Sequence, residues 1–70
     1  MGKMKVIIQH RETLKYLSVD QSWTNDEKEA MQFEKSLLAF DHCQKENLSN
    51  MQVVLKFHDP RYDLRLRVGS

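Results

Sequence analysis

The sequence has little cysteine, proline or glycine, and it has no long apolar run. A single cysteine, Cys43, excludes a disulfide framework within the chain. Because small secreted domains usually depend on such bridges, the composition favours a reducing, cytoplasmic setting. One proline and two glycines, beside 40% hydrophobic residues, argue against disorder. The apolar run nearest the N-terminus spans only residues 6–8, so neither a secretory leader nor a membrane segment is expected.

The length of 70 residues leaves room for one small core. We therefore expect one α+β domain over residues 1–70, with residues 1–3 and 69–70 as flexible or vector-derived ends. In this size range a single core rarely supplies more than about 3–5 kcal/mol. Such a domain gains stability when association buries its remaining apolar surface.

Charge is distributed unevenly along the chain, although the formal net charge is only +1. Residues 1–19 carry four Lys or Arg and one Glu, and residues 51–70 carry four Lys or Arg and two Asp. Residues 20–50 carry three Lys and seven Asp or Glu. An acidic middle segment is thus expected between two basic ends.

Alternating and β-branched residues predict strands near both ends of the chain. Residues 4–9 and 14–19 are expected to form a first hairpin around a polar turn. Residues 51–58 and 64–68 are expected to form a second hairpin, with Asp59 and Pro60 starting its turn.

Between the hairpins, residues 25–47 have helical spacing, with apolar residues at Ala30, Phe33, Leu37 and Phe40. Thr24 and Glu27 match a capping box, and Asn47 followed by Leu48 predicts a Schellman-type stop. One helix and a short segment followed by a helix both fit, with the break between residues 32 and 36.

The resulting fold class is a small antiparallel sheet of about four strands, in the order ββαββ, with one main helix packed on one face. The predicted buried face holds Val6, Ile8, Leu14, Tyr16, Val53, Leu55, Phe57, Leu64, Leu66 and Val68. The predicted open face holds Lys5, Ile7, Lys15, Leu17, Val54, Lys56, Arg65 and Arg67.

The order of several packing residues over residues 14–68 resembles a group of short bacterial proteins with a hairpin, a Trp, a main helix and a terminal hairpin. The matching residues are Trp23, Thr24, Ala30, Phe33, Ala39, Cys43, Leu48, Val53, Val54, Leu55, Phe57, the segment Asp59-Pro60-Arg61-Tyr62-Asp63, Leu64 and Leu66. That group has no assigned activity, so the resemblance implies a fold and no catalytic residues. It also implies that Ser36 caps a second, main helix.

The predicted open face is the candidate binding site, because an apolar centre with a charged rim is typical of a contact surface. The terminal hairpin loop adds two residue types that interfaces favour, although its turn chemistry favours the simpler interpretation of a rigid four-residue turn. The candidate binding residues are Ile7, Leu17, Val54, Lys56, Arg61, Tyr62, Arg65 and Arg67.

These residues predict a non-enzymatic interaction module that binds a protein partner or a second copy of itself. The alternative is weak nucleic-acid binding by the same basic face, which has few aromatic residues for base stacking. No cofactor or metal is expected, because adjacent His42 and Cys43 on a helix do not face each other. The same spacing argues against a catalytic pair, so no enzymatic activity is expected.

Overall fold

A computed structural model describes residues 4–57 and 59–68, and the ends expected to be flexible, together with His58, lie outside this description. These described residues form one α-helix, two short 3-10 turns and a five-stranded sheet. The α+β class is therefore confirmed, with one strand more than expected. No helix in the described part of the chain is long and apolar enough to cross a membrane.

The sheet is antiparallel and has the order β3-β2-β1-β4-β5. Strands β1 (Lys5–His10) and β4 (Met51–Lys56) form its centre, paired from Lys5 opposite Lys56 to His10 opposite Met51. Strands β2 (Tyr16–Leu17) and β3 (Trp23–Thr24) are short, and β5 (Leu64–Arg67) forms the far edge. The extra strand is β3, which the acidic middle segment contributes.

The segment between the hairpins is not one helix. A 3-10 turn, η1 (Glu27–Glu29), comes first, and its cap is Asp26, which accepts a hydrogen bond from the Lys28 N–H. The capping box expected at Thr24 is therefore wrong, since Thr24 belongs to β3. Helix α1 (Ser36–Lys45) follows after an extended stretch, so of the two arrangements left open by the sequence the interrupted one is present. The cap role implied for Ser36 is wrong, because Lys35 is the N-cap and Ser36 is the first residue of the helix.

The end of α1 has the predicted geometry. Asn47 adopts a positive φ of 53°, and the Leu48 N–H donates to the Cys43 carbonyl over 2.9 Å. The Asn47 N–H donates to the Gln44 carbonyl, and these two bonds together define a Schellman motif. This stop turns the chain directly into β4.

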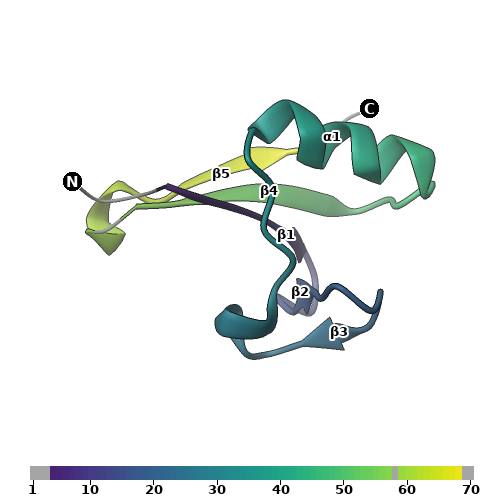
Figure 1. The fold of residues 1–70 in the computed structure, drawn as a ribbon, viewed down its shortest axis with the longest axis horizontal. Helices are drawn as coiled ribbons and strands as arrows, with labels where there is room; N and C mark the ends of the chain where they lie inside the picture. The colour runs from purple at the N-terminus through teal and green to yellow at the C-terminus, as the bar shows by residue number, and fades with distance from the viewer. Residues whose placement is uncertain (1–3, 58, 69–70) are drawn as a thin grey trace.

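The two faces of the sheet are covered by different segments (Figure 1). Helix α1 lies over β1 and β4 and inserts Ala39 and Cys43 into the main core. The strand residues of this core include Val6, Ile8, Met51, Val53 and Leu55. On the opposite face, Ala30 packs against Ile7 and Val54. The residues after η1 therefore cover the face that the sequence predicts to be open.

Extended pairing holds this covering segment in place. The Met31 N–H donates to the Leu17 carbonyl (2.8 Å), and the Phe33 N–H donates to the Val6 carbonyl (2.8 Å). Single bridges join Ala30 to Ser18 and Phe33 to Val6. Residues 30–33 thus run along the edge of the sheet, where β2 is too short to pair with the first half of β1.

Candidate functional site

The apolar centre of the predicted site is inside the protein. Ile7, Leu17 and Val54 are 0%, 2% and 2% exposed. The expectation that they line an open face is wrong, because Ala30 and Tyr16 pack over Ile7 and Val54. Leu17 lies on the helix side instead, in the main core. None of the three side chains is available to a partner in this conformation.

The turn of the first hairpin explains why Leu17 and Tyr16 exchange faces. Leu14 has a positive φ of 63° and is exposed, so β2 begins only at Tyr16. Tyr16 is opposite Gln9 and therefore lies on the side of Ile7. Successive strand residues alternate between faces, so one residue of slip reverses both assignments.

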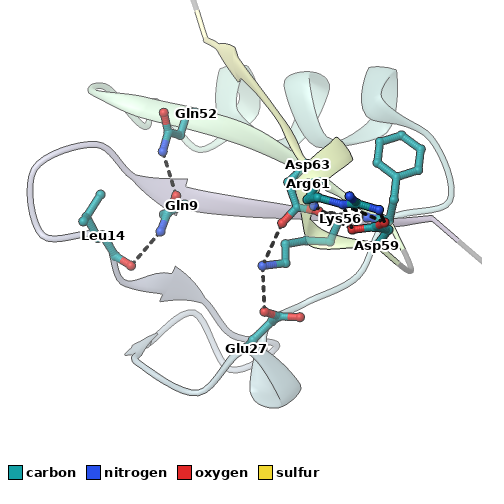
Figure 2. A network of polar contacts seen from close by, with 9 residues as sticks. Gln9, Leu14, Glu27, Gln52, Lys56, Asp59, Arg61 and Asp63 are labelled. Atoms are coloured by element: carbon teal, nitrogen blue, oxygen red, sulfur yellow. Dashed lines mark hydrogen bonds and ion pairs between the residues drawn. The ribbon is translucent and has the colours of Figure 1, made fainter.

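Lys56 forms ion pairs with two carboxylates (Figure 2). Its Nζ lies 3.0 Å from Glu27 Oε2 and 3.2 Å from Asp63 Oδ2. The hydrogen bond to Glu27, supported by Asp63, raises the pKa of Lys56 against the opposing effect of burial. The pKa of Asp63 is lowered, mainly by the hydrogen bond that it accepts from the Phe57 N–H and to a smaller extent by Lys56. Lys56 is therefore a structural link between η1, β4 and the terminal hairpin.

In the terminal hairpin loop, Asp59 caps its own turn, as the turn chemistry predicts. Asp59 accepts a hydrogen bond from the Arg61 N–H (3.0 Å), and its other carboxylate oxygen lies 2.7 Å from Arg61 Nη2. These bonds lower the pKa of Asp59 and raise that of Arg61. The Arg61 guanidinium lies 5.9 Å from the centre of the Tyr62 ring, and Tyr62 is 63% exposed. The loop therefore presents an aromatic ring to solvent.

Strand β5 is the exposed part of the predicted site. All four of its residues are exposed, including Arg65 and Arg67. Neither arginine forms an ion pair with any residue between 4 and 57 or between 59 and 68. Since β5 is last in the strand order, its outer edge has no paired strand within these ranges.

Two residues that the sequence assigns to the core belong to this surface. Leu64 is 52% exposed and Leu66 is 37% exposed, although both lie on the helix side, opposite Leu55 and Val53. A helix is about 10 Å wide and strands are about 4.8 Å apart, so one helix covers about two strands. Helix α1 covers β1 and β4 and leaves β5 bare. The width of a single helix, compared with the width of the sheet, could have predicted that Leu64 and Leu66 are exposed.

A polar depression of about 390 Å³ lies between β2, β3 and η1. Its lining includes Ser18, Asp20, Ser22, Thr24, Lys28 and Glu29. Asp20 accepts hydrogen bonds from the hydroxyls of Ser18 and Ser22, which lower its pKa to about 2. A carboxylate with so low a pKa is a weak base at neutral pH. A second carboxylate of the lining, Glu29, accepts a hydrogen bond from the Thr24 hydroxyl over 3.0 Å.

The described residues bring no three His, Cys, Asp or Glu side chains into a metal-binding cluster. Cys43 is buried, and burial raises the pKa of its thiol. His42 lies beside Phe33, with 5.6 Å between ring centres, and its buried Nε2 has no hydrogen-bond partner among residues 4–57 and 59–68.

Comparison with protein-family models, curated proteins and solved structures finds no match to this chain. The resemblance to short bacterial proteins therefore stays a prediction, and functional inference depends on the geometry of the site.

Proposed function

We propose that this protein is a non-enzymatic interaction module that binds a protein partner along β5 and the terminal hairpin loop. The observation that carries the proposal is an edge strand whose side chains are all exposed, with leucines on one face and arginines on the other. This surface retains Arg61, Tyr62, Arg65 and Arg67 from the sequence prediction and replaces its buried apolar centre with Leu64 and Leu66.

An unpaired edge strand is a template for another strand, and proteins usually protect such edges. Protection by charge accounts for Arg65 and Arg67, but it does not account for the exposed leucines that alternate with them. Leucines beside charged groups are the composition of a contact surface. Tyr62 extends the surface at one end of β5, and a tyrosine side chain, which has only two χ angles, loses little conformational freedom on binding.

The proposal includes no catalytic step. The proposal includes a reducing, cytoplasmic location. Small secreted domains usually depend on disulfide bonds for stability, whereas Cys43 of this chain is a free, buried thiol.

Site-specific photocrosslinking tests the proposal. A photoreactive phenylalanine analogue replaces Leu64 on β5 or, as a control, Leu14, which is 56% exposed in the turn of the other hairpin. We expect a product of defined mass from position 64 in an extract of the source cells, and none from position 14. Arg65→Pro should remove that product. Equal products from both positions, or a product that Arg65→Pro leaves unchanged, would contradict the proposal.

Nucleic-acid binding remains the alternative, since Arg65 and Arg67 are free cations on one surface. It is less well supported, because a stacking surface needs aromatic rings along the strand and β5 has none.

A further inference from the structure

Only two residues of β5 point their backbone N–H and C=O groups away from β4, toward the free edge of the sheet. The Val68 N–H donates to the Met51 carbonyl over 3.1 Å, and the register of β4 with β5 places these residues opposite each other. In an antiparallel pair, hydrogen-bonded positions alternate with non-hydrogen-bonded ones. Leu64 and Leu66 therefore bond toward β4. The N–H and C=O groups of Arg65 and Arg67 point to the free edge.

The same two residues place positive charge beside those backbone groups. Arg65 and Arg67 are opposite Val54 and Gln52, on the face away from α1. The two carboxylates of the terminal hairpin loop pair with other cations, Asp59 with Arg61 and Asp63 with Lys56. Arg65 contributes to the low pKa of Asp63 only as a minor electrostatic effect. A strand added here meets two cations that form no ion pair with the residues described by the structure.

The other face offers an apolar strip. Leu64 and Leu66 are both on the side of α1, and they are more exposed than any residue of β4. An incoming strand alternates its side chains between the two faces. Its residues opposite the arginines therefore meet positive charge, and the residues between them lie beside leucines.

A second copy of this chain does not match that edge. In antiparallel pairing of two such edges, the outward residues of one strand pair with the outward residues of the other. Each register within β5 therefore places an arginine opposite an arginine. Like charges directly opposite each other destabilise a strand pair, so the edge disfavours its own copy.

We infer that the free edge of β5 binds an extended segment of a partner protein in which acidic residues alternate with apolar ones. This inference rests on the proposed function and names the chemistry of its partner. Backbone groups of the segment bond to Arg65 and Arg67, its carboxylates pair with the two guanidinium groups, and its apolar residues contact Leu64 and Leu66. Strand addition of this kind takes its affinity from the backbone and its specificity from side chains.

Binding of a capped, fluorescent peptide of alternating glutamate and valine tests the inference, with a lysine–valine peptide as its control. We expect the full-length protein to bind the glutamate peptide more tightly, with an affinity that falls as salt is added. The double variant Arg65→Glu/Arg67→Glu should bind the glutamate peptide about tenfold more weakly and should prefer the lysine peptide. The double variant Arg65→Lys/Arg67→Lys keeps the charge and should keep the preference.

Equal affinity for the two peptides would overturn the acidic partner. If crosslinking from position 64 still depended on Arg65, the proposed function would stand without this partner chemistry. If that crosslinking also failed, both would fall.

Two other occupants have distinct signatures. A concentration-dependent dimer in sedimentation, dissociated by Arg65→Pro, would show that a second copy fills the edge and would overturn the inference. A single-stranded oligonucleotide that displaces the glutamate peptide and binds more tightly would overturn it in favour of nucleic acid.

Discussion

Lys56 Nζ lies 3.0 Å from Glu27 Oε2, and this ion pair joins the covering segment to the centre of the sheet (Figure 2). Glu27 begins η1, and Ala30, three residues later, packs on Ile7 and Val54. The pair therefore lies at the margin of the apolar contact that closes the second face. Its partial exposure, 22% for the Lys56 side chain and 36% for Glu27, limits its strength.

Glu27→Gln should lower the free energy of unfolding by about 0.2–1 kcal/mol, because it removes one charge partner of Lys56 and leaves Asp63 in place. Urea denaturation measures the change. The difference from wild type should shrink in high salt, since salt screens an exposed pair. Glu34→Gln is the matched control, because Glu34 is exposed and forms no ion pair with the described residues. Equal losses in the two variants would contradict a specific role for the pair.

Val54→Asp should unfold the domain. Val54 is 2% exposed, and an unpaired carboxylate there costs more than the roughly 3–5 kcal/mol that a core of this size supplies. Leu66→Asp on the neighbouring strand should leave the fold intact, because Leu66 is 37% exposed. Far-ultraviolet circular dichroism distinguishes the two variants. A folded Val54→Asp protein would show that the covering segment leaves that face accessible.

Stability should also depend on the ionisation of Asp20. Its pKa in the folded protein is lowered from 3.8 to about 2, chiefly by the Ser18 hydroxyl. A lowered folded-state pKa gives stability that is present above the unfolded value and is lost as the pH falls through the folded value. The melting-temperature difference between wild type and Asp20→Asn should therefore shrink as the pH falls from about 4 to about 2, the interval between the unfolded and folded pKa of Asp20. A constant difference over that range would contradict this role.

Local signals in the sequence predicted the elements with strong local chemistry. Asn47 and Leu48 fixed the end of α1, because a positive φ suits Asn and the Schellman bonds are made within one turn. Asp59 capped its own turn for the same local reason. The alternation in β4 correctly placed Val53 and Leu55 on the helix side.

Features that depend on distant contacts were not predictable in this way. Ala30 and Phe33 have helical spacing, yet they form bridges to Ser18 and Val6, because the edge beside β1 was otherwise unpaired. Tertiary pairing therefore outweighed helical periodicity. Leu64 has the pattern of a core strand, and only the width of one helix leaves it exposed.

The most direct test of the central claim, that β5 offers a free edge at Arg65 and Arg67, is residue-resolved amide hydrogen exchange. In the free protein, the amides of Leu66 and Val68 should exchange slowly and those of Arg65 and Arg67 rapidly. Addition of the glutamate–valine peptide should slow exchange at Arg65 and Arg67. Slow exchange at these two amides in the isolated monomer, or no change on adding the peptide, would contradict the account.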